Sequence, residues 1–450
     1  MGNLWDSCWK NDYKFPFTAE QVILLFAKLK IENAAKVQAA GIAQFLPGVK
    51  DTRYVNGQPF VEEGLLADCK GFFLSQAGDG QNFLSLVSFE QDELGPLGLT
   101  TIVGKPGAVY ASADSLYVAD RHYLNQMSAW YFETSEGIQE ATTIHKFRLN
   151  PDSVKTSYFG SGVVKGRVLN QFAMDEHHGH LRIATTVGHL PNPDAYNTVH
   201  VLAEGNHELI VSGLIDHIAP SEDIRSARFD GDQGYIVTFK KTDPLFVLDL
   251  KDPQYPKIAG ELKIPGFSTY IHLMEEGYLL SIGYDADDQG SFAWFQGIML
   301  QIFDVHDMAD PKLVHKEVIG TRGSTSEAAT NHLAFNYFRD KHMLAIPMTI
   351  CLGGTGGQHG DQMAFSGLLV YKVTTQDGFK KLGGVPHAAP EAAPDYYNSA
   401  CGNWWTQSNS VVQRSVFMED WVYSVAYDLI QVASVADLEH PVQSIVLDPK

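Results

Sequence analysis

The stretch LFVLDLKDPQYPKI, from Leu245 to Ile258, has a counterpart in LQIFDVHDMADPKL, from Leu300 to Leu313. Each begins with an apolar run that ends at an aspartate, continues through a short turn rich in Asp and Pro, and resumes with Pro-Lys and an aliphatic residue. Apolar runs joined by turn residues in this way are typical of β-hairpins. The two aspartates, Asp249 and Asp304, are 55 residues apart, which indicates a repeating unit of about that length.

Repeats of this kind extend over most of the chain. Weaker copies of the hairpin begin near residues 83, 143, 198, 368 and 430, and the seven copies recur about every 58 residues. A second hairpin with a tight polar turn precedes six of them, for example at 228–239, 270–280 and 416–425. Two hairpins per repeat are the signature of a four-stranded propeller blade. We therefore predict an all-β fold over residues 80–450, a β-propeller of four-stranded antiparallel blades with six clear blades and a seventh.

The N-terminal part of the chain, residues 1–79, has a different pattern. Thr18 and Gln21 have the spacing of a helix capping box, and apolar residues recur behind them at helical spacing. We predict one helix over about residues 18–46 in this segment. For the seventh blade, residues 83–89 and 99–104 provide an outer hairpin, and residues 54–75 are the segment available for an inner one.

The composition of the 450 residues excludes several classes of protein. Hydrophobic residues make up 44%, aromatic residues 11% and charged residues 19%, which is typical of a globular chain and not of a disordered one. The 53 acidic residues outnumber the 33 basic ones, and the net charge of −20 disfavours binding to nucleic acid or to anionic membrane surfaces. No run of 18 apolar residues occurs, so we expect no transmembrane segment.

Four cysteines, Cys8, Cys69, Cys351 and Cys401, indicate two possible states. None has a partner at the Cys-x-x-Cys spacing of a zinc site. The simplest disulfide pairing joins sequence neighbours, Cys8 with Cys69 and Cys351 with Cys401. The alternative is four buried thiols.

The repeat also predicts which loops share a face of the propeller. The turns within each hairpin are short and share one face, here called the short-turn face, whereas the connections between hairpins are long and share the other, the long-loop face. Long loops on a rigid scaffold commonly carry binding sites. Aromatic side chains give a large contact area at low entropy cost, so these loops favour a glycan, peptide or protein partner; packing of the loops is the alternative. The candidate ligand-binding residues are Trp130, Trp294, Phe295, His359, Trp404 and Trp405.

Two groups of polar residues have the composition of metal ligand sets. Asp285, Asp287 and Asp288, in a long-loop connection, offer the hard oxygen ligands that calcium prefers; an acidic solvated loop is the alternative. The denser cluster DEHHGH, from Asp175 to His180, offers ligands for zinc, copper or nickel. It falls in a short hairpin turn, where solvated side chains are the simpler interpretation.

Polar residues on the innermost strands are expected to line the central channel, namely Asn170, Arg225, His272, His332 and Arg414. Of these, His272 and His332 are candidate catalytic residues for an alternative function. That function is a metal-assisted hydrolase, in which Asp285 and Asp287 help to bind a cation that lowers the pKa of a bound water. Neither a Gly-x-Ser-x-Gly nor a His-Glu-x-x-His motif occurs, so we rank binding above catalysis.

Three blocks of the chain carry a resemblance to a known family. They run from Ile224 to Ser268, from Gly166 to Thr186 and from Val412 to Asp420. They resemble the bacterial and archaeal family of secreted β-propeller domain proteins that are distantly related to WD40 repeats. The resemblance covers roughly residues 80–450 and implies an exported protein, extracellular or periplasmic, although no signal peptide is present in this sequence. It transfers no catalytic residues, and we expect a binding or scaffold module that uses its long-loop face.

Overall fold

The computed structural model describes most of the chain. The described residues are 18–41, 44, 46–66, 71–74, 82–90, 98–105, 107–123, 140–150, 156–239, 243–264, 266–289, 293–354, 357–387, 401–402 and 408–447. The chain forms two compact units. The first comprises Met1–Leu74, Gln81–Val103 and Pro151–Thr156, and the second comprises Ser75–Gly80, Gly104–Asn150 and Ser157–Lys450.

The first unit contains the predicted N-terminal helix, α2 (Ala19–Ala39). Its capping box is confirmed, because the Thr18 side chain accepts a hydrogen bond from the Gln21 backbone N–H at 3.2 Å, and the Gln21 side chain accepts one from Thr18 at 2.9 Å. The helix ends earlier than predicted, since Ala40 is already extended.

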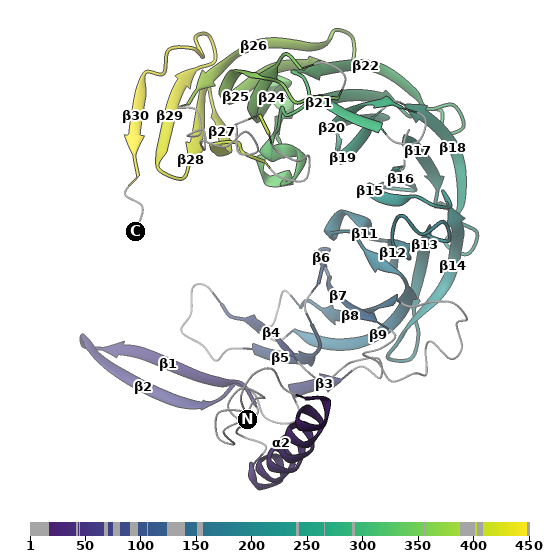
Figure 1. The fold of residues 1–450 in the computed structure, drawn as a ribbon, viewed down its shortest axis with the longest axis vertical. Coiled ribbons are helices and arrows are strands. Elements are labelled where there is room, and N and C mark those ends of the chain that lie inside the picture. Colours follow the sequence, from purple (N-terminus) through teal and green to yellow (C-terminus); the bar gives the residue numbers. More distant parts are fainter. Residues whose placement is uncertain are drawn as a thin grey trace. The chain divides into compact units, whose positions relative to one another are not determined.

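The first unit also contains two small sheets. Strands β1 (Gly48–Val55) and β2 (Gln58–Leu65) form a long hairpin of their own (Figure 1). Strands β4 (Phe83–Ser88) and β5 (Gly98–Val103) pair antiparallel, as predicted for an outer hairpin, and β3 (Phe72–Leu74) adds to β5 in parallel. The segment expected to supply the inner hairpin of a seventh blade thus forms the separate β1–β2 sheet and β3.

The described part of the second unit contains six antiparallel sheets with the strand order of propeller blades; five are four-stranded, and the sheet of blade 2 has its inner strand in two pieces. Blade 1 is β6 (Val109–Ala111), β7 (Ser115–Tyr123), β8 (Glu140–Arg148) and β9 (Ser157–Lys165). Blade 2 is β10 (Arg167–Val168), β11 (Met174–His177), β12 (His180–Val187), β13 (Tyr196–Glu204) and β14 (Leu209–Ile218), with its inner strand split into β10 and β11 by a 3₁₀ turn, η4 (Gln171–Ala173).

The remaining four blades follow in chain order. Blade 3 is β15 (Asp223–Asp230), β16 (Gln233–Phe239), β17 (Asp243–Asp249) and β18 (Lys257–Ile264). Blade 4 is β19 (Phe267–Leu273), β20 (Tyr278–Asp288), β21 (Ala293–Asp304) and β22 (Lys312–Ile319). Blade 5 is β23 (Asn336–Phe338), β24 (Met343–Leu352), β25 (Gln362–Thr374) and β26 (Gly378–Pro386). Blade 6 is β27 (Val412–Met418), β28 (Trp421–Ala426), β29 (Leu429–Ser434) and β30 (Gln443–Val446).

Successive blades lie side by side within the second unit (Figure 1). The middle strands of blades 2 to 5 are buried on both faces because each packs against two neighbouring blades, whereas β28 of blade 6 alternates between buried and more exposed residues. For example, Phe267 and Leu300 of blade 4 belong to one fully buried cluster with Ile346 and Leu369 of blade 5. Three short 3₁₀ turns, η5 (Glu327–Ala329), η6 (His332–Ala334) and η7 (Arg339–Lys341), lie in the connections around the inner strand of blade 5.

The register of the inner strands fixes which residues share a face. In blade 3, Asp223 pairs with Phe239 at one end of the inner hairpin and Asp230 pairs with Gln233 at the tight turn. The first end is on the long-loop face and the second is on the short-turn face. Residues at the start of an inner strand therefore lie at the long-loop face, on the channel side of their blade.

Within the part of the chain that the structure describes, no helix is both long and apolar enough to cross a membrane.

Candidate functional site

A pocket of about 310 Å³ lies on the long-loop face, at the inner edges of blades 2 to 5. Its volume is at the lower end of the range usual for ligand sites. Residues that begin an inner strand, or lie in the connection just before one, provide most of its lining. The polar lining residues are Arg167, Asn170 and Thr186 of blade 2, Asp223 and Arg225 of blade 3, Thr269 of blade 4, and Thr330 ahead of blade 5.

A glycine sets the position of Arg167 in this pocket. Gly166 has φ of +81°, and a Cβ added to it would lie 2.4 Å from the carbonyl oxygen of Thr186. Only glycine fits this turn without displacing the neighbouring strand. Asn170 is held from the other side, because its side chain caps η4 by accepting a hydrogen bond from Phe172 N–H at 3.0 Å.

Alternating charges connect the pocket to blade 1. Glu140 has a side chain that is only 4% exposed, and it pairs with Arg121 and, at 3.6 Å, with Arg167. Asp223 lies between two arginines, 3.9 Å from the Arg167 guanidinium and 3.1 Å from that of Arg225. Three guanidinium groups and two carboxylates thus alternate along this edge of the pocket.

The Arg167 charge is partly desolvated. Burial lowers the pKa of Arg167, and Arg121 lowers it further, while Glu140 and Asp223 oppose the shift. A guanidinium remains charged under such a shift, so Arg167 gains from any additional anion. The arrangement therefore suits a ligand that brings a negatively charged group, and arginines recognise carboxylates with paired N–H donors.

Of the two channel histidines, His272 lies on the inner strand β19, whereas His332 lies in η6, in the connection before β23, and not on an inner strand as predicted. The Tyr270 hydroxyl is 3.1 Å from His272 Nδ1, and Gln171 Nε2 is 3.3 Å from His332 Nε2. The rings of His272 and His332 both contact Tyr270, with centroids 6.0 and 6.2 Å from its ring. Burial, aided by Arg228, lowers the pKa of His272 to about 4. Burial also lowers the pKa of His332, with further contributions from Arg414 and Arg228.

The carboxylates of the hydrolase hypothesis do not join these histidines. His272 pairs with Leu280, and Asp285 lies five residues further along β20, roughly 16 Å away at the rise of a strand. Asp285 forms an ion pair of 2.6 Å with Lys316, and Asp287 accepts a hydrogen bond of 2.7 Å from Gln296. The Asp288 side chain is outside the described residues. The calcium site stays a prediction, and the first of its carboxylates is shared with a lysine.

One predicted loop aromatic, Trp294, is held by its neighbours on the long-loop face. The Arg322 guanidinium lies 4.4 Å from the centre of the Trp294 ring, a cation–π distance, and a Cβ on Gly357 would lie 2.4 Å from the indole. Phe295 packs against Phe239 and Phe267, with ring centroids 5.5 and 5.2 Å apart. Both aromatic side chains are half-buried.

A disulfide ties the loops beside Trp294. Cys351, at the end of β24, is bonded to Cys401, 50 residues later, with an S–S distance of 2.03 Å. This predicted pairing is confirmed. Gly323 lies against both the Cys401 carbonyl and the His359 ring, which places His359 beside the disulfide. Trp130, Trp404, Trp405, Cys8 and Cys69 lie outside the described residues.

Sequence reasoning named Asn170 and Arg225 but missed Arg121, Glu140, Arg167 and Asp223. A usable signal was present, since Gly166-Arg167 and Asp223-Ile-Arg225 open the inner strands of two successive blades. Charged residues at equivalent positions of neighbouring repeats meet at the channel. Aligning the repeats by their inner strands would have brought these residues together.

These features define the class of the protein. The sheets of the second unit are the blades of a β-propeller, and their inner strands form a charged pocket on one face. The profile of the family described as "Beta propeller domain" matches residues 19–438, and the chain belongs to this family. The predicted fold and the resemblance that implied it are confirmed.

Two archaeal relatives share part of the sequence. An uncharacterized protein of Archaeoglobus fulgidus is 40% identical over 294 residues, which cover 65% of this chain and 38% of that protein. An uncharacterized protein of Methanocaldococcus jannaschii is 43% identical over 178 residues, which cover 39% of this chain and 26% of that protein. The matched region is therefore less than half of the length of either relative.

Solved structures show more distant likeness. A Lactobacillus plantarum protein has a TM-score of 0.41 at 11% identity, over 81% of this chain and 96% of that one. Sqt1 of Saccharomyces cerevisiae has a TM-score of 0.41 at 8% identity, over 83% and 89%. The Pan2 WD40 domain of Neurospora crassa has 0.36 at 8%, over 77% and 80%. This likeness is too distant to carry a function to the present chain.

Proposed function

We propose that the protein is a binding module that receives a carboxylate of a peptide or protein partner between Arg167 and Arg225 on its long-loop face. The β-propeller fold suggests a binding or scaffold module in general. The pocket supports the more specific function, because two arginines from neighbouring blades flank one aspartate and line the pocket with guanidinium groups.

The surroundings of the pocket favour a peptide over a larger ligand. A volume of about 310 Å³ accommodates one or two side chains, and Leu169 and Ile224 give the pocket apolar walls beside the arginines. Such a pocket accepts an acidic side chain or a chain terminus together with its aliphatic stem. The chain as a whole carries a charge of −20, so a local positive pocket selects for a well-placed carboxylate over general electrostatic attraction.

The test is binding of labelled peptides with a free or an amidated C-terminus, alone and with added Asp or Glu residues, and of uronic-acid oligosaccharides, to the full chain. We expect peptides with a carboxylate to bind, and Arg167→Ala and Arg225→Ala to lower their affinity at least about tenfold, as for a lost charge-assisted contact. Arg148→Gln is the matched control, because Arg148 pairs with Glu204 on the short-turn face. Equal affinity in all three variants, or binding of the oligosaccharides alone, would overturn the proposal.

We propose in addition that the protein acts outside the cytoplasm. The Cys351–Cys401 disulfide supports this, because disulfides persist mainly in oxidising compartments. The test is alkylation of intact cells of the native host, followed by mass spectrometry of the peptides that contain Cys351 and Cys401. Recovery of an oxidised pair in the exported fraction is expected, and reduced cysteines in the cytoplasmic fraction would contradict the proposal.

A further inference from the structure

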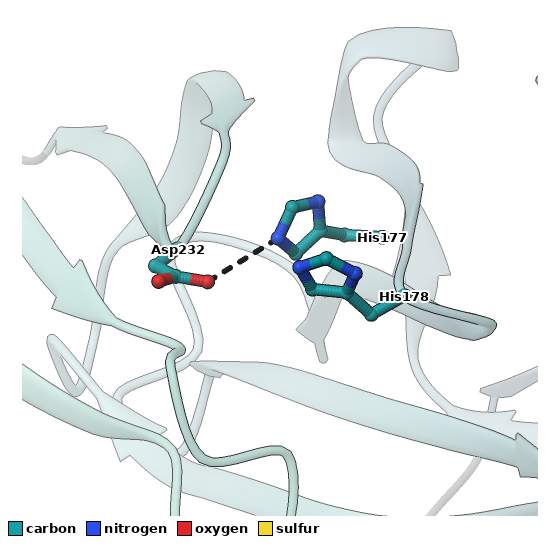
Figure 2. A group of neighbouring side chains, drawn as sticks. All are labelled: His177, His178 and Asp232. Carbon is teal, nitrogen blue, oxygen red and sulfur yellow. Dashed lines mark hydrogen bonds and ion pairs between the residues drawn. The ribbon is translucent and has the colours of Figure 1, made fainter.

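Three potential metal ligands from two blades meet on the short-turn face. His177 and His178 come from the tight turn between β11 and β12 of blade 2, and Asp232 comes from the tight turn between β15 and β16 of blade 3 (Figure 2). We propose that these three residues form a binding site for a divalent transition metal ion of the zinc class. The site is on the opposite face from the arginine pocket and does not depend on the function proposed for it.

The distances between the ligand atoms suit a metal after small side-chain rotations. His177 Nε2 is 3.2 Å from Asp232 Oδ1, and the centres of the two imidazole rings are 4.0 Å apart. One ligand atom from each residue lies within 4.8 Å of the other two. Ligand atoms around a tetrahedral zinc ion are about 3.3 Å apart, given bonds of about 2.0 Å. Because His178 and Asp232 are exposed, rotation of their side chains closes the difference without moving the backbone.

The backbone of the turn is what brings the two histidines together. Consecutive residues of a strand point to opposite faces of the sheet, so an extended His177-His178 pair would be divided between two faces. Here His178 has φ of +48° and Gly179 has φ of +75°, the left-handed conformation of a tight two-residue hairpin turn. Figure 2 shows the result, with the His178 ring beside that of His177, which points toward Asp232. Residues other than glycine rarely adopt this backbone conformation. At His178 the conformation places the second imidazole at the site.

A buried arginine holds the two turns against each other. The Arg182 side chain is 3% exposed; it pairs with Asp175 of β11 and donates a hydrogen bond to the carbonyl of Gly231, the residue before Asp232. Its charge is balanced by Asp175, which limits its repulsion of a bound cation. The spacing between the blade 2 turn and the blade 3 turn is thereby fixed by a contact that is independent of the three ligands.

The donor set selects the class of ion. Two imidazoles and one carboxylate suit zinc, copper or nickel, whereas calcium and magnesium prefer a shell of oxygen ligands. Three protein ligands leave one tetrahedral position for water or for a group from a partner. Imidazole must be deprotonated to bind a metal, so the affinity of such a site falls in acid.

The test is calorimetric titration of the chelator-treated full chain with ZnCl₂ at pH 7.5, and with CaCl₂ for comparison. We expect one zinc ion per chain at this site, much weaker calcium binding, and at least about a tenfold loss of zinc affinity in His177→Ala, His178→Ala and Asp232→Asn, since each removes one of three ligands. His440→Ala is the matched control, because His440 is an exposed histidine 2.9 Å from Asp437 and does not belong to this cluster of three ligands.

Circular dichroism melting of each variant shows whether it is folded, and these surface substitutions are expected to leave the fold intact. As a second measurement, Co²⁺ in place of zinc gives visible absorption bands that report nitrogen ligands. Loss of these bands in His178→Ala, but not in His440→Ala, would support the site. Zinc affinity that is unchanged in His177→Ala and His178→Ala, or that falls equally in His440→Ala, would overturn the proposal.

Discussion

The ammonium group of Lys146, on β8 of blade 1, lies 3.0 Å from Glu176 Oε1, on β11 of blade 2. The Lys146 side chain is only 2% exposed, and its second partner is Glu204 of β13, at 2.8 Å. The Tyr117 hydroxyl of β7 donates to the same Glu176 oxygen at 2.9 Å. A buried charge at the boundary between two blades is thus fully paired, and its partners come from the neighbouring blade.

Lys146→Met should destabilise the protein by about 3 kcal/mol. Methionine keeps the aliphatic packing of the lysine stem but leaves the Glu176 carboxylate without its cation in a poorly solvated position. The measurement is the free energy of unfolding in urea. Lys341→Met is the control, because Lys341 pairs with the exposed Asp420 and should contribute less than about 1 kcal/mol. A loss in Lys146→Met no larger than in this control would show that the buried pair stabilises little.

The free energy of unfolding should also fall in acid, because the Glu176 carboxylate becomes protonated. Burial raises the pKa of Glu176, but hydrogen bonds from Ser112, Lys146 and Tyr117 outweigh it, and the net shift is downward. A carboxylate whose folded pKa is lowered stabilises the folded state fully above its unfolded pKa, about 4.3, and loses that contribution as the pH falls through the folded value. The urea midpoint of the wild type should therefore drop more steeply below about pH 4.3 than that of Glu176→Gln. Parallel curves for the two proteins would contradict this.

The hairpins were predictable because their signals are local. In the two stretches that decided the fold, the Asp249 side chain accepts from the Lys251 N–H at 3.2 Å, and the Asp304 side chain accepts from the His306 N–H at 3.1 Å. An aspartate that bonds to the backbone two residues later builds a turn wherever it occurs. Both turns therefore formed where the sequence indicated them, and repetition of the pattern predicted the blades.

The pocket was only partly predictable because its contacts are not local. Arg167 and Asp223 are far apart in the sequence and meet only because successive inner strands lie side by side. The same applies to Asp232, which no motif linked to His177 and His178. The end of the helix was also missed, because α2 stops at Ala39, where the following Ala40 is extended, whereas the prediction carried the helix to about residue 46.

Removal of the Cys351–Cys401 disulfide should lower the free energy of unfolding by about 2–4 kcal/mol. The bond closes a loop of 50 residues, and the entropy that such a loop regains in the unfolded chain accounts for most of this range. The measurement is the unfolding free energy of Cys351→Ala/Cys401→Ala, and of the wild type with a reducing agent. The two should agree, and the reducing agent should have no effect on the double variant. An effect of reduction that persists in the double variant would show that another bond is responsible.

Asp223→Asn should strengthen binding of a carboxylate in the arginine pocket. Asp223 partly neutralises both Arg167 and Arg225, at 3.9 and 3.1 Å, so its charge competes with an anionic ligand for the same donors. If the loss of this competition makes the binding free energy of the carboxylate about 1 kcal/mol more favourable, the affinity rises about fivefold at low salt. The gain should shrink as the salt concentration rises, because the pocket is partly exposed to screening ions. Titration of a carboxylate peptide at 50 and 500 mM NaCl measures both effects, with the neutral amidated peptide as the control. A weaker interaction in Asp223→Asn would mean that the aspartate orients the arginines more than it competes with the ligand.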